Sequence, residues 1–294
     1  MNWNIHSNAL IALASALAWG GGDFSGGMGV KAAGGSTRST LRVILMSHSV
    51  SFIVLASIIL LRHEPIPHGA LLGWGVLAGV AGGISLTAFY IALSRGEMGV
   101  SAAISGLLAA AIPALVSSLL EGAPGTLRIV GFALAFIAIW AIAAGPSPED
   151  SGRSTLSLAI LAGLGFGVYF VALRMANPLG IFMPMALARI GSLSTCGLTL
   201  MALRLSGGKE DGGAKRLPSA AILWALSVAL LDTGGNMLFV AATRLGRLDV
   251  AAVLASLYPA STILLAAWQL HERPTRRQLV GMAVAVAAVV MVSI

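Results

Sequence analysis

Ten apolar runs of roughly twenty residues, joined by short polar connections, constrain the fold of this chain more than any other feature. A helix of about twenty residues crosses a hydrocarbon core of about 30 Å. Lipid-exposed backbone must satisfy its own hydrogen bonds, and no segment shows the short alternating pattern of a barrel strand. The expected fold class is therefore all-α, a polytopic membrane bundle of ten transmembrane helices. The expected spans are 8–29, 40–61, 69–93, 100–120, 126–144, 155–174, 181–205, 219–242, 250–270 and 277–294.

Charged residues are too few to cover a water-facing surface. They make up 10% of the chain, whereas a soluble domain carries about 25%, so we expect an integral membrane protein. As its location we expect the bacterial cytoplasmic (inner) membrane. The net charge of +7 is spread over short connections, and no nucleic-acid partner is expected. Cys196 is the only cysteine, which excludes an intramolecular disulfide and a cysteine-built metal site. No metal site is expected.

The chain resembles itself when it is shifted by 150 residues. The aligned pairs include Trp19 with Tyr169, Phe89 with Phe239 and Pro124 with Pro274. A slip of three residues in the loops also pairs Arg42 with Arg189. We expect two five-helix repeats, residues 1–147 and 148–294, in one integrated transmembrane domain. Because five is odd, the second repeat must enter the membrane from the opposite side, as inverted repeats of secondary transporters do.

Two segments of the second half resemble a known family. Leu257-Tyr-Pro-Ala-Ser261 and His271-Glu-Arg-Pro-Thr-Arg-Arg-Gln-Leu-Val-Gly281 are similar to the S-L-x-P helix and the G-E-R-x-T-x-x-Q-x-x-G connection of the drug/metabolite transporter superfamily, in its ten-helix EamA branch. Ala18-Trp-Gly20 and Arg42 fit the same pattern. The chain departs from the family pattern at two places. His271 stands in place of the usual Gly, and the first half has Glu121-Gly-Ala-Pro-Gly125 where the family would have its G-E-R-like segment.

The resemblance implies an exporter of amino acids or related small metabolites that uses no ATP and no cofactor. It also implies that both termini are cytoplasmic. The distribution of Lys and Arg over the connections points instead to both termini outside, so the sequence leaves the orientation open.

Only two carboxylates fall inside the expected helices. The other nine acidic residues lie in the expected connections: Glu64, Glu97, Glu121, Glu149, Asp150, Glu210, Asp211, Asp249 and Glu272. A carboxylate at a helix centre costs about 2.5 to 3.5 kcal/mol on insertion scales, so it usually faces a cavity or a partner. Asp23 and Asp232 are thus candidates for ion coupling, although Asp23 is close enough to a helix end to snorkel instead.

Asp232 is also the centre of the expected substrate site. Asn236 follows it by four residues on the same helix face, and Arg189 is the natural counter-ion because no other basic residue lies well within a span. The alternative is a structural ion pair that orients two helices.

Aromatic residues are the expected walls of this site. Trp19 and Tyr169 are paired by the repeat and should face one cavity, joined by Tyr90 or Tyr258. The remaining tryptophans are expected at the membrane interface or facing lipid. These are Trp3, Trp74, Trp140, Trp224 and Trp268.

Prolines and glycines shape the expected helices. Pro113 and Pro259 can bend the repeat-related helices that must move during gating, or they can be static kinks. Gly75, Gly79 and Gly83 form a stripe of small residues at four-residue spacing, which indicates close helix packing rather than ligand contact.

The leading hypothesis is a secondary transporter that exports amino acids or related metabolites by alternating access. The expected partners are a small-molecule substrate and the lipid bilayer, and the chain is expected to be a monomer. The alternatives are a transporter of other solutes, such as drug-like cations or nucleotide sugars, a channel, and an intramembrane enzyme. His48 is the only histidine that could serve a membrane serine, and no G-x-S-x-G turn accompanies it.

Overall fold

The computed structural model describes residues 3–95, 98–143, 153–206, 216–269 and 275–293. Within these ranges the chain forms eleven α-helices and one 3-10 turn, and no strand. The helices are α1 (Trp3–Ala32), α2 (Thr37–Leu61), α3 (Ala70–Arg95), α4 (Met98–Leu120), α5 (Thr126–Ala143), α6 (Arg153–Met175), α7 (Phe182–Leu205), α8 (Ser219–Leu245), α9 (Leu248–Ala255), α10 (Tyr258–Gln269) and α11 (Arg276–Ser293), with η1 (Asn177–Leu179) between α6 and α7. The all-α prediction is confirmed.

The outer surface of the bundle is apolar. Leu61, Leu119 and Leu230 are 81%, 85% and 74% exposed, which only a hydrocarbon solvent tolerates over so many positions. In the described residues, six helical segments are long and apolar enough to cross a membrane, and two shorter helices are also apolar. The chain is therefore an integral membrane protein.

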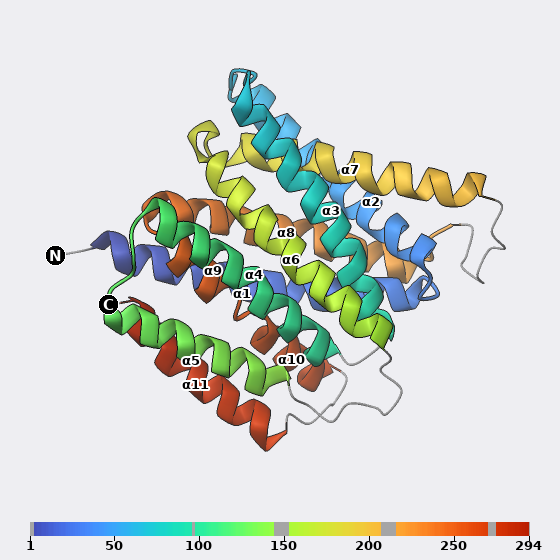
Figure 1. The fold of residues 1–294 in the computed structure, drawn as a ribbon. Helices are drawn as coiled ribbons and strands as arrows, with labels where there is room; N and C mark the ends of the chain where they lie inside the picture. The colour runs from blue at the N-terminus through green and yellow to red at the C-terminus, as the bar shows by residue number, and fades with distance from the viewer. Residues whose placement is uncertain (1–2, 96–97, 144–152, 207–215, 270–274, 294) are drawn as a thin grey trace.

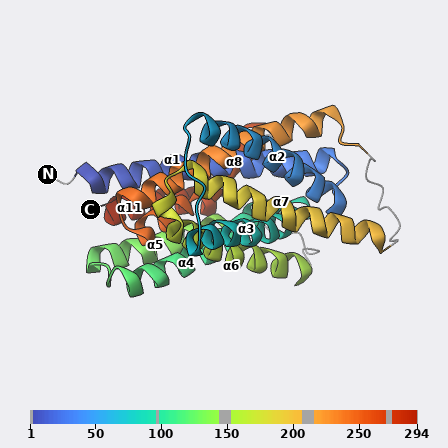
Figure 2. The ribbon, with the colours of Figure 1, turned by 90° about the horizontal axis from the view of Figure 1, so that it is seen from above.

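The helices run along one another in a long bundle (Figure 1). α1 lies against α8, α3 lies against α6 and α7, and α5 pairs with α11 at one edge. When α9 and α10 are counted as one broken helix, the described residues form ten long helices, as the sequence predicts. The beginning of α1 and the end of α11 lie at the same end of the bundle (Figures 1 and 2), in keeping with an even number.

The ninth expected span is not one helix. The sequence predicts a continuous run over 250–270, but α9 ends at Ala255 and α10 begins at Tyr258. Pro259 thereby stands in the first turn of α10, where its missing N–H leaves no hydrogen bond unmade. Pro113 lies inside α4, which continues through it. Pro113 and Pro259 thus have different local structures, and a role of either in gating stays a prediction.

Glycines bring α3 and α7 into close contact. A Cβ added at Gly75 would lie 2.7 Å from Leu187 Cβ, and one at Gly79 would overlap the backbone oxygen of Ala188. A Cβ at Gly83 would meet the Ser192 side chain at 3.0 Å. The close packing expected from this stripe is confirmed, and it places the Arg189 turn of α7 directly against α3.

The family-like connection before the last helix contains a capping box. The Thr275 backbone N–H donates to Gln278 Oε1 at 2.8 Å, and the Gln278 backbone N–H donates to Thr275 Oγ1 at 3.2 Å. These reciprocal bonds satisfy two of the backbone donors that the start of α11 would leave unpaired. The T-x-x-Q part of the motif therefore has a structural role here.

A polar network links the end of α4 to α6 and to the start of α9. Arg174 donates to Glu121 Oε1 at 2.9 Å, and Arg247 donates to the Glu121 carbonyl oxygen at 3.0 Å. Burial by itself would raise the pKa of Glu121, but hydrogen bonds from Ser117, Arg174 and the Leu248 N–H together hold it below its ordinary value. The carboxylate therefore stays ionised and keeps these helix ends together at neutral pH.

Asp249 was expected in a connection and is instead buried in the first turn of α9. Its carboxylate accepts from the Val250 N–H at 2.8 Å and from Arg247 at 2.8 Å. A carboxylate is favourable at a helix N-terminus, where backbone N–H groups are unpaired. The hydrogen bond to Asp249 in turn raises the pKa of Arg247.

Candidate functional site

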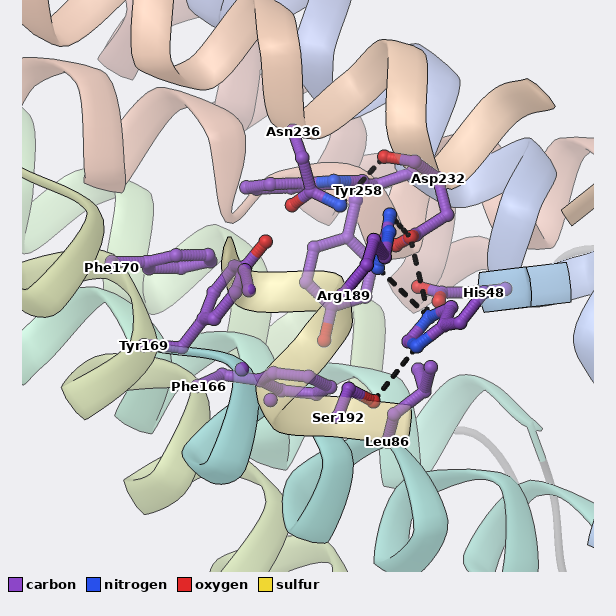
Figure 3. A pocket seen from close by; sticks show the side chains of 15 residues that line it. His48, Leu86, Phe166, Tyr169, Phe170, Arg189, Ser192, Asp232, Asn236 and Tyr258 are labelled. Atoms are coloured by element: carbon purple, nitrogen blue, oxygen red, sulfur yellow. Dashed lines mark hydrogen bonds and ion pairs between the residues drawn. The ribbon is translucent and has the colours of Figure 1, made fainter. Parts of the chain in front are cut away.

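A cavity lies between helices of both halves of the chain, with walls from α1, α2, α3, α6, α7, α8 and α10. It offers about 50 Å³ to the centres of water molecules, which is space for several waters. The predicted residues that line it are Trp19, Asp23, Tyr169, Arg189, Asp232, Asn236 and Tyr258. Figure 3 shows Arg189 in the middle of this group, between Asp232 and His48.

Tyr90 is the predicted wall residue that does not line the cavity. It is fully buried in α3, next to Phe89 and against Gly26, where a Cβ would collide with its ring. Of the two tyrosines that the sequence offered as alternatives, Tyr258 is the one at the cavity. Pro113, Pro259 and Arg42 are also absent from its lining.

Arg189 and Asp232 form the predicted ion pair. Arg189 is 3% exposed, and its terminal Nη2 donates to Asp232 Oδ2 at 2.6 Å and to Thr233 Oγ1 at 3.0 Å. The pair joins α7 to α8 across the cavity wall. Asn236 donates to the Asp232 backbone carbonyl at 2.7 Å and lines the same cavity. Their contact with a substrate stays a prediction.

His48 is a central residue of the site that our sequence analysis did not assign to it. It is 2% exposed in α2, and its two ring nitrogens bond to two residues of α7: Nε2 is 2.9 Å from Arg189 Nη1 and Nδ1 is 2.8 Å from Ser192 Oγ. The sequence signal for this residue was a histidine in the middle of an apolar span. Ser47 precedes it directly, and Ser51 follows it by three residues. Ser51 bonds to Thr233 at 2.7 Å, so this polar stripe of α2 completes the network.

The hydrogen bonds of His48 define its tautomer. Arg189 carries only N–H donors and stays protonated, so His48 Nε2 must accept and carries no proton. The ring is then neutral, with its proton on Nδ1, and donates to Ser192 Oγ. A histidine in this state cannot take the Ser192 proton through Nδ1, as a nucleophilic serine would require. The contact is therefore a structural hydrogen bond rather than an enzyme dyad.

We expect His48 to remain in the neutral Nδ1–H form at neutral pH. Nitrogen NMR of protein labelled at histidine should show one protonated and one unprotonated ring nitrogen for the signal that disappears in His48→Gln. The same signal should change to the other tautomer or broaden in Arg189→Gln, because the donor that fixes Nε2 is gone. A doubly protonated ring in the wild-type protein would contradict this assignment.

Aromatic rings form the apolar wall. Trp19 stacks on Phe170 with centroids 5.0 Å apart and meets Tyr258 edge-on at 6.5 Å. Phe170, like Phe166 in the same helix, lines the cavity and was not predicted, because nothing in an apolar run distinguishes a cavity-facing Phe from a lipid-facing one. Trp19 and Tyr169 each cover a glycine: a Cβ at Gly235 would lie 2.5 Å from the Trp19 ring, and one at Gly82 would lie 3.0 Å from the Tyr169 ring.

Asp23 does not snorkel to a helix end. α1 continues to Ala32, so the carboxylate lies more than two turns from its end, and it lines the cavity with Asp232. The shorter helix expected from the sequence had placed it too close to the membrane surface. The described residues include no hydrogen-bond donor or cation paired with it.

The other tryptophans are divided between lipid and protein. Trp140 and Trp268 are 60% and 75% exposed, as expected for lipid-facing or interfacial residues, and Arg277 lies 4.0 Å above the Trp140 ring. Trp74 and Trp224 are half-buried, and Trp224 packs edge-on against Phe24 at 6.0 Å. The side chain of Trp3 is outside the described part. No cluster of three or more potential metal ligands occurs among the described residues.

An all-α bundle of membrane-crossing helices around a polar, aromatic-walled cavity defines a membrane transporter fold. Residues 153–294 of the chain match the EamA-like transporter family, which is part of the drug/metabolite transporter superfamily. The resemblance seen in its motifs is thus confirmed.

The fold is shared with known structures. A solved structure titled "Crystal structure of protein" is similar with a TM-score of 0.70 and 15% sequence identity, over 97% of this chain and 96% of that chain. At this identity the likeness concerns the fold alone. No curated protein matches the chain.

Proposed function

We propose that this protein is a secondary transporter that exports amino acids or related small amine-bearing metabolites by alternating access around the cavity at Arg189. The observation that carries the proposal is the Arg189–Asp232 pair, buried in a cavity whose walls come from both halves of the chain. Ionisable groups inside a membrane are costly and are typical of substrate and ion pathways.

The arrangement of helices supports alternating access. A shift of 150 residues relates α1 to α6 and α3 to α8. The contact between α1 and α8 should therefore have a counterpart between α6 and α3. Both contacts exist, and in each of them an aromatic residue covers a glycine of the partner helix. The family match over 153–294 also begins close to the proposed boundary between the repeats at 147 and 148. Inverted repeats of this kind supply two equivalent ways to open a central site.

The chemistry of the cavity supports a substrate that carries an amine. A solute that leaves water must exchange its hydration for hydrogen bonds and counter-charges. Asp23 and Asp232 are acceptors for an ammonium group, and the rings around Trp19 accept an apolar body. Asp23 and Asp232 are also our candidates for ion coupling, since a buried carboxylate can exchange a proton for another cation.

Counterflow in proteoliposomes tests this function. Vesicles loaded with an unlabelled amino acid or amine should accumulate the labelled form transiently, because a carrier exchanges the two. Asp232→Asn should lose this exchange or change its pH dependence, whereas Leu230→Ala, at a 74% exposed position of the same helix, should keep it. Flux without counterflow would favour a channel, and a chemically altered solute would favour an enzyme. Wild-type exchange and pH profile in a normally inserted Asp232→Asn variant would remove Asp232 from the site.

A further inference from the structure

We propose that the cavity selects an organic monocation, a primary ammonium on an apolar body, and that Asp23 is the counter-ion of this ammonium. This inference rests on the proposed transport function and specifies the substrate class of the same cavity. It follows from the charges, the hydrogen bonds and the rings that line the cavity.

The charges of the cavity do not balance. Arg189 is compensated by Asp232, with 2.6 Å between Nη2 and Oδ2. His48 adds no charge, because Arg189 donates to its Nε2. Asp23 remains without a hydrogen-bond donor or a cation among the described residues, although it lines the same space. One positive and two negative side chains therefore leave one negative charge when both carboxylates are ionised, which a monocation can neutralise.

The donors that a substrate carboxylate would need are already used. Both terminal nitrogens of Arg189 are engaged by Asp232, Thr233 and His48. Its Nε has no partner, but this atom is buried and presents no surface to the cavity. A substrate carboxylate would have to displace Asp232 from Arg189 and would then lie in one cavity with two other carboxylates. An amino acid therefore gains less here than the amine that lacks its carboxylate.

The aromatic part of the lining suits the rest of an organic cation. Trp19 and Phe170 are stacked with an interplanar angle of 8°, and Tyr258 stands edge-on to Trp19. A ring face attracts a cation that lies over it, and the same rings shelter an apolar chain. Tyr169 belongs to the same lining and packs on Phe170 with ring centroids 5.7 Å apart, so its ring extends this aromatic surface.

Matched pairs of solutes test the substrate class. The first pair is phenylethylamine and phenylalanine, and the second is isoamylamine and leucine. Calorimetry on the protein in lipid nanodiscs would measure the binding of each compound, and counterflow in proteoliposomes would measure its transport. Each amine should bind about tenfold or more tightly than its amino acid, which corresponds to about 1.4 kcal/mol. Tighter binding of both amino acids would overturn the selection of a monocation, and their counterflow would still support the proposed function. Failure of all four in both assays would count against the inference and against the proposed function.

Variants of α1 test the role of Asp23. Asp23→Asn keeps the shape of the side chain and should weaken amine binding about tenfold. Asp23→Glu should restore most of it, because the charge returns. Leu17→Ala, at a 66% exposed position of the same helix, should bind as the wild type does. Unchanged amine affinity in a folded Asp23→Asn protein would assign the ammonium to another group and overturn the role of Asp23.

Discussion

Arg189→Gln is expected to destabilise the protein by about 3 to 5 kcal/mol and to abolish counterflow. Arg189 is 3% exposed and bonds to residues of both α2 and α8. Removing one partner of a buried ion pair leaves the other charge uncompensated, which accounts for a cost of this size. Asp232 is only partly exposed, with 17% of its side chain accessible, and cannot regain full hydration. Thermal unfolding in one detergent, followed for wild type and variant together, measures the loss.

The double variant Arg189→Gln, Asp232→Asn separates charge from packing. With both charges removed, two amides can bond to each other, and most of the lost stability should return, because replacing a whole buried pair by neutral groups costs little. Transport should not return, since the acceptor at Asp232 is also gone. If the single and double variants unfolded at the same temperature, the ion pair would not be the source of the loss.

Gly79→Ala is expected to lower the free energy of unfolding by about 3 kcal/mol, which is at the upper end of the usual destabilisation by overpacking. The added Cβ would overlap the backbone oxygen of Ala188, and a helix backbone cannot move aside as a flexible side chain can. α7 would have to separate from α3 next to Arg189, so transport should fall together with stability. Unfolding temperature and counterflow measured on the same preparation follow the two effects.

Gly73→Ala is the matched control in the same helix. Nothing lies within 4 Å of the Cβ position of Gly73, so alanine should be neutral there or stabilise α3 by up to about 1 kcal/mol through its higher helix propensity. Equal losses from the two substitutions would mean that chain flexibility, rather than the contact between α3 and α7, explains the effect of Gly79.

The ten helices and the all-α class could be predicted because each span satisfies its own length and hydrogen-bond requirements. Helix continuity was harder to predict. Pro113 lies within α4, whereas the chain breaks before Pro259. A proline is compatible with a kinked helix or with a first turn, and the neighbouring helices decide between these outcomes.

The Arg189–Asp232 pair could also be predicted, because few charges lie within the spans and each requires a partner. The other partners of Arg189 could not be predicted from the sequence. His48 lies 141 residues away from Arg189 in the sequence, and its ring meets it only because α2 packs against α7.

The sequence left Asp23 open between ion coupling and snorkelling because α1 was expected to end sooner, and Phe170 could not be distinguished from a lipid-facing residue. In a helix of a soluble protein the polar face is exposed and the apolar face is buried. A helix surrounded by lipid is apolar on all its faces, so its sequence does not show which face is buried. The sequence by itself therefore determined the fold class, the number of helices and the central ion pair, since these depend on the cost of polar groups in hydrocarbon. Only the tertiary structure decided which faces meet at the cavity, because the packing of small residues rather than hydrophobicity selects the contacts between apolar helices.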